Sequence, residues 1–338
     1  MPVKAVIDLR KIRNNAKKVK DLLPAKTKLC AVVKADAYGH GAAETAAALY
    51  KIADCFAVAT VEEGVVLRLS GIDKEILVLT KAFKSDAEIA VIYRLTLTAE
   101  SLQDLKLYSS FAKKSKTKVS VHLKYDTGMH RQGFSGVKEL NEAFKFCGRR
   151  KYISADGLYT HYAAPENENS LQIATDKFLI AINLAKGYNK NIVCHASASG
   201  GFLCGKFFDM VRIGILLYGY TPFKTDKIKV SPAMKVIAPV VRRREIKKGE
   251  SALYGVKQAK EDFSLTLVRY GYADGLFRKE IKGQFNSRCM DVTAMTDIKG
   301  ENFVTVMDDA EKLARDYGTI SYEILVKCAL RAEKIYLR

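Results

Sequence analysis

The residues with the clearest chemical potential lie in the run AVVKADAYGHG, from Ala31 to Gly41. An apolar stretch ends at Lys34, and small residues, Tyr38 and two glycines around His40 follow. A buried strand that ends in an amine and a glycine-rich turn is how a barrel enzyme presents a nucleophile. Lysine is the side chain that forms a Schiff base with an aldehyde cofactor such as pyridoxal phosphate. The alternative is a lysine at a strand end whose amine simply extends into solvent.

Eight apolar runs with the character of strands would position such residues, and stretches of helical composition separate them. Several runs are apolar without alternation, as expected of strands that are buried on both faces. The runs are Lys28–Lys34, Cys55–Thr60, Glu75–Thr80, Leu95–Thr98, Val119–Tyr125, Ile153–Tyr162, Ile192–Ala196 and Met210–Leu217. This alternation predicts an α/β fold with an N-terminal (β/α)8 barrel, or TIM barrel, over residues 10–225.

The pattern changes after residue 225, where short strand-like runs joined by polar turns replace the alternation. The runs are 231–246, 263–272, 291–297 and 302–307, and two short helical stretches follow at 310–317 and 322–330. Residues 226–338 are therefore expected to form a second, mostly-β domain.

The chemically interesting residues fall where the predicted barrel strands end, which is where barrel active sites lie. They are Lys34 and Tyr38 after the first strand, Lys124, Asp126, Met129 and Arg131 at the fifth, His161 at the sixth, Ser197 and Ser199 at the seventh, and Arg212, Gly214 and Ile215 in the last. Each has an ordinary alternative, since His161 could be a satisfied, half-buried histidine and Arg212 the partner in a salt bridge. Their shared position at one end of the barrel favours a common site.

The composition excludes several classes of protein. No apolar run reaches the ~20 residues that a membrane helix needs, and the start MPVKAVIDLRKIRNN lacks the apolar region of a signal peptide. Seven dispersed cysteines without a CxxC pair argue against a disulfide framework and against a metal site of the zinc type. We therefore expect free thiols in a cytoplasmic protein.

The net charge of +19 suits anionic partners, among them nucleic acid. The basic residues are dispersed, however, and aromatic residues do not alternate with them. The positive charge is therefore better explained by a solvated basic surface than by a function as a basic nucleic-acid-binding protein.

The string KADAYGHG resembles the cofactor-lysine motif of the alanine racemases, which are barrel-type pyridoxal phosphate enzymes. The resemblance extends over nearly the whole chain through further blocks in the same order, which are LKYDTGMHRQG, THYA, HASASGG, RIGILLYG, LYG, GYADG, CMD and GTISYE. One block alone is a weak signal. The shared order of all of them makes the resemblance specific, and it implies pyridoxal 5'-phosphate as the cofactor.

By this resemblance, Lys34 would hold the cofactor and serve as one catalytic base, and Tyr254 would be the other. The two bases would act on opposite faces of a planar carbanion, so that L-alanine and D-alanine interconvert. Lysine and tyrosine both have reference pKa values near 10, so neighbouring cations must lower them for work near neutral pH. His161 and Arg212 resemble the chain of residues that connects the tyrosine to the pyridine nitrogen. An arginine there would keep that nitrogen unprotonated, because it cannot give up its own proton.

The resemblance also implies binding residues. The positions that match phosphate ligands are Tyr38, Ser199, Gly214, Ile215 and Tyr322. Arg131 matches an arginine that contacts the cofactor and the substrate carboxylate, and Lys124 matches a lysine that is often carbamylated to position that arginine. Met290 and Asp291 match a pair near the substrate carboxylate, and Tyr272 resembles a tyrosine at the mouth of the active-site channel.

The assembly and the physiological role are implied in the same way. In this family the tyrosine base comes from a second subunit, so a homodimer with composite active sites is expected. The first strand, within residues 1–9, would pack with the second domain. The product D-alanine would serve cell-wall synthesis as a peptidoglycan precursor.

Three departures from the family pattern stand out: His130 replaces a glycine, Ala198 an asparagine, and Leu253 a serine or threonine. None removes a proton-transfer group. A racemase of serine or another amino acid on the same scaffold remains an alternative, since small pockets discriminate poorly against one added hydroxyl. Another barrel-type pyridoxal phosphate enzyme and the basic nucleic-acid-binding protein are the remaining alternatives.

Overall fold

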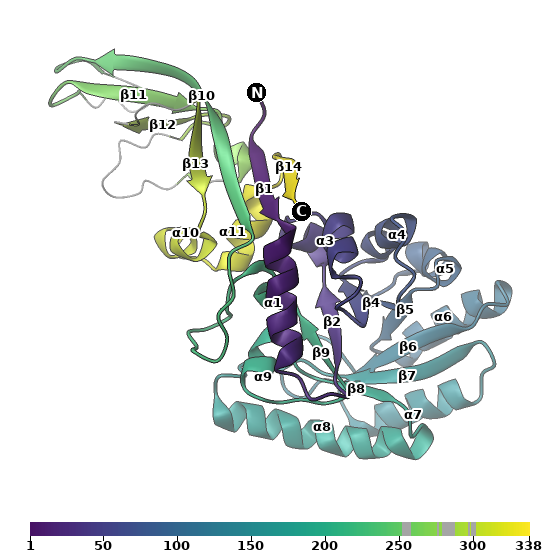
Figure 1. Cartoon of the computed structure of the whole chain (residues 1–338). Helices are drawn as coiled ribbons and strands as arrows, with labels where there is room; N and C mark the ends of the chain where they lie inside the picture. Colours follow the sequence, from purple (N-terminus) through teal and green to yellow (C-terminus); the bar gives the residue numbers. More distant parts are fainter. Residues whose placement is uncertain (252–257, 276, 279–287, 297, 299–301) are drawn as a thin grey trace. The chain divides into compact units, whose positions relative to one another are not determined.

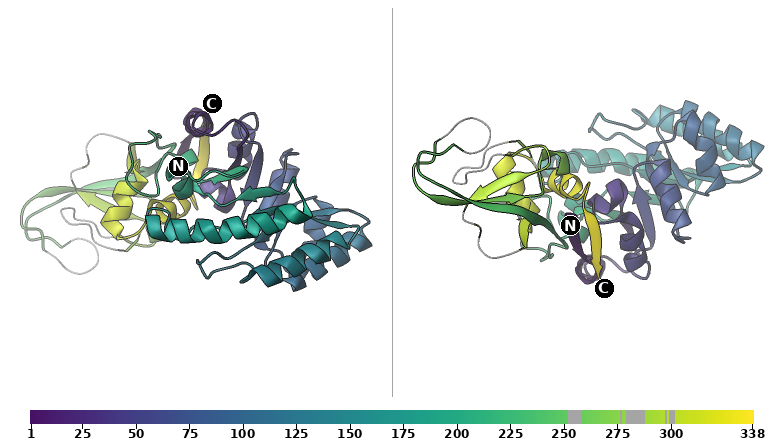
Figure 2. Two further views of the ribbon diagram at one scale, coloured as in Figure 1. Left: turned by 90° about the horizontal axis from the view of Figure 1, so that it is seen from below. Right: turned by 90° about the horizontal axis from the view of Figure 1, so that it is seen from above.

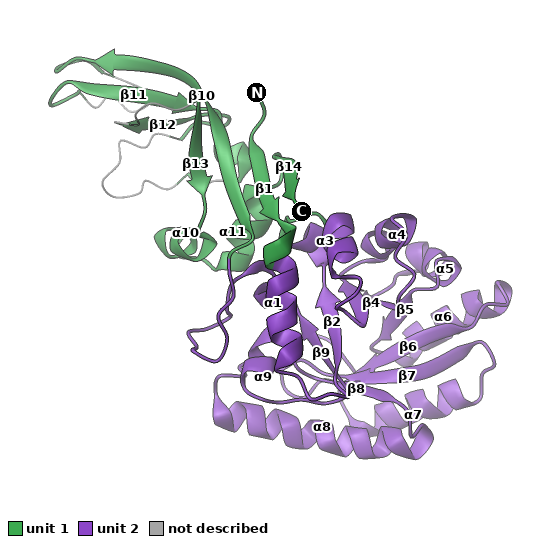
Figure 3. Ribbon diagram, in the orientation of Figure 1, with its two compact units in different colours: residues 1–11, 38–41, 232–338 green, residues 12–37, 42–231 purple. Residues whose placement is uncertain are grey.

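The computed structural model describes residues 1–251, 258–275, 277–278, 288–296, 298 and 302–338. The chain divides into two compact units (Figure 3). The barrel unit comprises residues 12–37 and 42–231, and the β unit comprises residues 1–11, 38–41 and 232–338.

The barrel unit is built on an eight-stranded parallel sheet, in the order β8-β7-β6-β5-β4-β3-β2-β9 (Figure 1). The N–H groups of Asp209 and Arg212 donate to the carbonyl oxygens of Cys194 and Ser197 at 3.0 and 2.9 Å, which joins the two ends of the sheet. The strands are β2 (Lys28–Val32), β3 (Cys55–Val58), β4 (Ile76–Lys81), β5 (Thr96–Ala99), β6 (Val119–Lys124), β7 (Ile153–Tyr159), β8 (Val193–His195) and β9 (Met210–Ile213). Each predicted run overlaps one of these strands, although β4 and β5 each extend one residue beyond theirs, so the predicted (β/α)8 barrel is confirmed.

Helices alternate with these strands along the chain. They are α1 (Leu9–Asp21), the short turn α2 (Lys34–Tyr38), α3 (Ala42–Leu49), α4 (Val61–Leu69), α5 (Lys84–Ile92), α6 (Leu102–Lys114), α7 (Val137–Gly148), α8 (Glu168–Tyr188) and α9 (Ser199–Leu203), with a 3-10 turn at Ile215–Tyr218. Several start at a side-chain cap, such as the reciprocal Thr60–Glu63 capping box of α4. The long helix α8, in teal, lies outside the strands at the bottom of Figure 1, and it is in front when the molecule is seen from below (Figure 2, left).

The β unit contains a mixed sheet in the order β12-β11-β10-β1-β14, and β13 pairs with β10. Its elements are β1 (Lys4–Asp8), β10 (Met234–Ile246), β11 (Phe263–Val268), β12 (Thr293–Thr296), β13 (Phe303–Met307), α10 (Ala310–Tyr317), α11 (Ser321–Cys328) and β14 (Glu333–Leu337), with a 3-10 turn at Tyr272–Asp274. The N-terminal strand β1 is antiparallel to β10 and parallel to β14. The predicted mostly-β character of this part is confirmed, and β14 is an element that the sequence pattern did not indicate.

Among the described residues, no helix is both long enough and apolar enough to cross a membrane. All seven cysteines lie in the described ranges, and all are free thiols, five of them buried.

Candidate active site

Lys34 lies just beyond the carboxyl end of β2, and the backbone after it forms a left-handed turn. Ala35, Asp36, Ala37 and Tyr38 have φ angles of 51°, 52°, 54° and 55°, which residues with a β-carbon rarely adopt. Each such residue costs about 1–2 kcal/mol, so surrounding contacts must hold the turn in place.

Hydrogen bonds to backbone N–H groups hold this turn. The Glu63 carboxylate, in the first turn of α4, accepts the N–H of Ala35 at 2.7 Å. Asp36 accepts the N–H of Ala42 at 2.7 Å, at the start of α3. The segment that begins at Lys34 is therefore tied to the helix before β3 and to the helix after it.

The Lys34 amine is held in a state that suits a nucleophile or a base. The side chain is partly exposed. Burial lowers the pKa of Lys34, the positive charge of Arg131 lowers it further, and the Glu63 carboxylate opposes both effects. More of the amine is therefore neutral near pH 7 than for an ordinary lysine, and the neutral form is the one that attacks a carbonyl or accepts a proton.

Arg131 belongs to the loop between β6 and α7, and hydrogen bonds fix this loop at its start and its end. Asp126 Oδ1 accepts the N–H groups of residues 128, 129 and 130 at 2.8, 2.9 and 3.2 Å. Phe134 exchanges backbone hydrogen bonds with Lys124 and Asp126 at 2.8 and 3.0 Å. His130 has a φ of +53°. This departure from the family's glycine therefore occupies a conformation that favours glycine.

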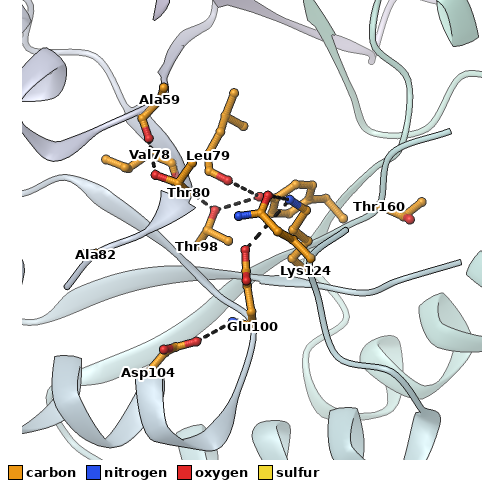
Figure 4. Close-up of polar contacts among 12 residues, drawn as sticks. Ala59, Val78, Leu79, Thr80, Ala82, Thr98, Glu100, Asp104, Lys124 and Thr160 are labelled. Atoms are coloured by element: carbon orange, nitrogen blue, oxygen red, sulfur yellow. Dashed lines mark hydrogen bonds and ion pairs between the residues drawn. The ribbon is translucent and has the colours of Figure 1, made fainter. Parts of the chain in front are cut away.

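Lys124 ends β6, and its amine lies inside the barrel unit near Arg131. Its Nζ donates to Gln132 Oε1 at 2.7 Å. The same atom lies 4.0 Å from Glu100 Oε1 (Figure 4). Burial has the largest effect and lowers the pKa of Lys124 to about 8; Glu100 raises it, and the other cations of the site lower it further. Lys124 therefore differs from a surface lysine, because its buried amine loses its proton at a lower pH.

Arg212, on β9, is a buried cation with several partners. Its guanidinium donates to His195 Nδ1 at 2.5 Å and to the carbonyl oxygens of Thr160 and Ala196 at 2.8 and 3.0 Å. The group also lies over the Tyr159 ring, 5.0 Å from its centroid. Three of its five N–H groups are thereby used within the described part of the chain, which leaves two for a ligand.

His161 follows β7 and faces the same cations. Burial lowers its pKa to about 3, and the positive charges of Arg212, Arg131, Lys124 and Lys34 add to the effect. The imidazole is therefore neutral at any ordinary pH. It also lines a cavity of about 370 Å³, together with residues of the loop after β6 and the start of α8 such as Met129.

The predicted phosphate-binding residues fall into both units. In the barrel unit, the Ser199 hydroxyl accepts the N–H of Gly214 at 3.4 Å, and Ile215 is buried at the start of the following turn. In the β unit, the rings of Tyr38 and Tyr322 lie 5.9 Å apart. Burial raises the pKa of Tyr322 to about 12, so both hydroxyls in this pair stay protonated and can donate.

The remaining predicted residues also belong to the β unit. The N–H of Tyr272 donates to the Cys289 carbonyl at 3.2 Å, which places Tyr272 beside the CMD block. Met290 is 55% exposed, and Asp291 forms an ion pair of 3.1 Å with Arg331. Tyr254 and Leu253 lie outside the described residues.

Several residues in this site were not predicted from the sequence. They are Glu63, Glu100, His122, Gln132 and His195. His122 and His195 were detectable as polar residues inside apolar strands, whereas Glu63 and Gln132 act only through contacts between segments far apart in the chain. His195 joins Arg212 to His122, whose Nδ1 lies 2.9 Å from His195 Nε2.

The comparisons with known proteins identify the family of this chain. Residues 7–222 match the family described as alanine racemase, N-terminal domain, and residues 233–336 match alanine racemase, C-terminal domain. The alanine racemase of Staphylococcus epidermidis is 30% identical over 93% of this chain and 89% of its own length, and alanine racemase 1 of Bacillus subtilis is 34% identical over 98% and 92%.

A solved structure extends the comparison to the fold. The alanine racemase of Clostridium difficile matches with a TM-score of 0.94 and 30% identity, covering 100% of this chain and 96% of that one. Both domains of the family are therefore represented here in sequence and in structure. The chain belongs to the alanine racemase family of enzymes, which supports the racemisation of alanine as its reaction.

Proposed function

We propose that the chain interconverts L-alanine and D-alanine with pyridoxal 5'-phosphate held at Lys34, and that Lys34 and Tyr254 are the two bases. The observation that carries this proposal is the Lys34 amine at a strand end of the barrel unit, with its pKa lowered by burial and by Arg131. The reaction itself follows the family of the chain.

The residues present fit this cofactor. Arg212 is a permanent donor with two N–H groups that no described residue uses. Lys34 offers an amine of lowered pKa to an aldehyde, and the nearby cations Arg131, Arg212 and Lys124 suit a phosphorylated, anionic compound. Hydroxyl donors at Ser199, Tyr38 and Tyr322 match the phosphate positions of the family.

When bound, pyridoxal 5'-phosphate links to the amine of an amino acid and withdraws electrons from its Cα–H bond. The side chains of Lys34, Tyr254 and Arg131 then act on the substrate. Lys34 moves the Cα proton on one face and Tyr254 on the other, so removal on one side and delivery on the other inverts the centre. Arg131 binds the substrate carboxylate.

Arg212 has an electronic task. Because a guanidinium keeps its proton, Arg212 would only donate to the ring nitrogen of a bound cofactor and would leave that nitrogen unprotonated. An arginine in this role would favour simple proton exchange over transamination or decarboxylation, because it would not increase electron withdrawal by the cofactor. His195 accepts a hydrogen bond from Arg212 and so positions it for this role, and the neutral His161 lies near Arg212.

The proposal extends to assembly and physiology. Tyr254 would come from a second copy of the chain, in a homodimer with two composite sites. The product D-alanine would enter cell-wall synthesis in the cytoplasm, where the seven free thiols would stay reduced.

A direct test uses the purified protein with pyridoxal 5'-phosphate and either L-alanine or L-serine, followed by separation of the enantiomers. We expect rapid formation of D-alanine and little D-serine. Comparable rates for both would assign the chain to the broader racemase class, and no D-isomer of either would refute the proposal. The Lys34→Ala variant should lose the visible absorbance of the bound cofactor.

The two-base assignment needs a separate test. The Tyr254→Phe variant should keep the cofactor but lose proton abstraction from one enantiomer far more than from the other. Exchange of the Cα proton with deuterated water, followed for each enantiomer separately, measures this asymmetry. Equal losses in both directions would argue against two bases on opposite faces.

A further inference from the structure

Glu100 is a carboxylate beside the site that the mechanism above does not use. It directly follows β5, and its Oε1 lies 4.0 Å from Lys124 Nζ with the two side chains 14% and 7% exposed. Figure 4 shows the carboxylate directed at Lys124. Within the described residues, this buried oxygen accepts no hydrogen bond. The backbone is fixed, because the N–H of Glu100 donates to Asp104 Oδ2 at 3.0 Å.

The other side of Lys124 leads to Arg131. Lys124 Nζ donates to Gln132 Oε1 at 2.7 Å, and Gln132 is the next residue after Arg131. An ammonium carries three donors, so one protonated amine can serve the amide and the carboxylate together. A continuous chain therefore joins Glu100, through Lys124 and Gln132, to the loop that carries Arg131.

The charges around Lys124 favour its cationic form when Glu100 is present. Glu100 exerts the strongest electrostatic effect on this amine and raises its pKa, while Arg131, Arg212 and Lys34 act in the opposite sense. With a pKa of about 8, the amine is still mostly protonated at pH 7. Burial raises the pKa of Glu100 and Asp104 adds to this effect, whereas the cations Lys124, Lys81 and Arg131 oppose it and favour the carboxylate.

We propose that Glu100 is a positioning residue, which keeps Lys124 as an unmodified ammonium so that the Glu100–Lys124–Gln132 chain holds the Arg131 loop. A carbamate on Lys124, which the family resemblance implies, would place a second negative charge next to the Glu100 carboxylate, where like charges repel. The built-in carboxylate thus takes the place of the carbamate. Only the role of Arg131 toward the substrate rests on the proposed function.

The first test asks whether Lys124 takes up carbon dioxide. The protein without cofactor is incubated with 13C-labelled bicarbonate and examined by 13C NMR for a carbonyl carbon bound to nitrogen. We expect no such signal in the wild-type protein. A stoichiometric signal that disappears in the Lys124→Arg variant would overturn the proposal.

The Glu100→Gln variant should behave in the opposite way. Without the carboxylate, three cations surround Lys124, its pKa falls, and more of the amine is neutral. The neutral amine then attacks the carbon of carbon dioxide, a nitrogen–carbon bond forms, and one proton passes to the buffer. We therefore expect the labelled signal in Glu100→Gln but not in the control Glu142→Gln, which removes an exposed carboxylate paired with Lys145 on α7. No signal in Glu100→Gln would overturn this account of the charges.

The second test measures positioning. In buffer free of carbon dioxide, Glu100→Gln should raise KM for alanine by about tenfold or more with a smaller change in kcat, because a looser Arg131 weakens substrate binding. Added bicarbonate should restore much of this loss in Glu100→Gln and change nothing in the wild type. An unchanged KM would overturn the positioning role. Because the NMR arm uses protein without cofactor or substrate, its result stands even if alanine is not racemised.

Discussion

The Arg212 guanidinium donates to Nδ1 of His195 at 2.5 Å in the interior of the barrel unit. Because arginine can only donate, Nδ1 must accept, and the proton of this imidazole resides on Nε2. That proton is directed to His122 Nδ1 at 2.9 Å. His122 then presents its own Nε2 proton to Glu75 Oε1, 3.4 Å away. One obligate donor therefore sets the tautomers of two buried histidines.

The first prediction concerns this contact. Replacing His195 by Ala leaves a buried N–H of Arg212 without its acceptor and opens a cavity, so the free energy of unfolding should fall by about 2–4 kcal/mol. Urea unfolding measures the change. The control His130→Ala alters a side chain that is 87% exposed and should cost less than about 0.5 kcal/mol. Similar effects of the two substitutions would contradict the importance of the Arg212 contact.

His161 should stay neutral in the folded protein across the physiological range. Burial and four nearby cations lower its pKa to about 3, against a usual value of 6.5. NMR of 15N-labelled histidine should show no titration of this ring between about pH 5 and 8, whereas the urea-unfolded chain should titrate near 6.5. A folded-state transition above pH 5 would contradict the prediction.

The same shift has a consequence for stability. Between pH 6.5 and 3, His161 is protonated in the unfolded chain but neutral in the folded chain. The free energy of unfolding should therefore decrease as the pH falls through this range. The His161→Gln variant should therefore lose less stability than the wild type between pH 7 and 4.

Because Lys124 is buried, the free energy of unfolding should depend on pH in the alkaline range. Its folded-state pKa of about 8 lies below the ordinary 10.5, so between these values only the unfolded chain keeps the proton. Stability should thus rise with pH across this window by about 3 kcal/mol for this buried group. The measurement is urea unfolding at pH 7.5 and 10.5 in buffer free of carbon dioxide.

The comparison with variants isolates this effect from other groups that titrate in the same range. Lys124→Met should lack the rise, whereas Lys114→Met, at a position 70% exposed, should retain it. If the free energy of unfolding changes equally in the wild type and in Lys124→Met between the two pH values, burial does not lower the pKa of this amine.

The Glu63 carboxylate should contribute more to stability and to cofactor retention than that of Glu62, its neighbour on α4. Its carboxylate accepts the N–H of Ala35 at 2.7 Å and that of Ala59 at 2.6 Å. Glu63→Ala should lower the free energy of unfolding by about 1–3 kcal/mol and weaken retention of pyridoxal 5'-phosphate, because the segment after Lys34 loses its anchor. Thermal unfolding and equilibrium dialysis measure the two effects. Glu62→Ala removes an exposed carboxylate from the same turn and should change neither.

The sequence allowed much of the fold to be predicted, because burial on both faces leaves a continuous apolar run. Even the short run 95–98 corresponds to β5 at Thr96–Ala99, and the helix predicted at 310–317 coincides with α10. The strand β14 was missed because its residues, Glu333–Leu337, are half-buried or exposed and form no strong apolar pattern.

The site was predictable only where a residue type carries its own signal. A lysine that ends an apolar run, as Lys34 does, stands out in one segment. Glu100 and Gln132 gain their meaning from Lys124, and this contact exists only after β5 and β6 pair and the loop after β6 closes. Such partnerships between segments leave no periodic mark in a single sequence.

The left-handed turn after Lys34 has a consequence for handedness. From Ala35 to Tyr38 the backbone follows the winding that residues of the D configuration adopt without strain. A synthetic chain with D-alanine at position 35 or 37 would therefore fit this turn better than the natural one, if its reversed side chain finds space. In a protein made only of L-amino acids, four consecutive residues after Lys34 therefore adopt a backbone conformation that D-amino acids favour.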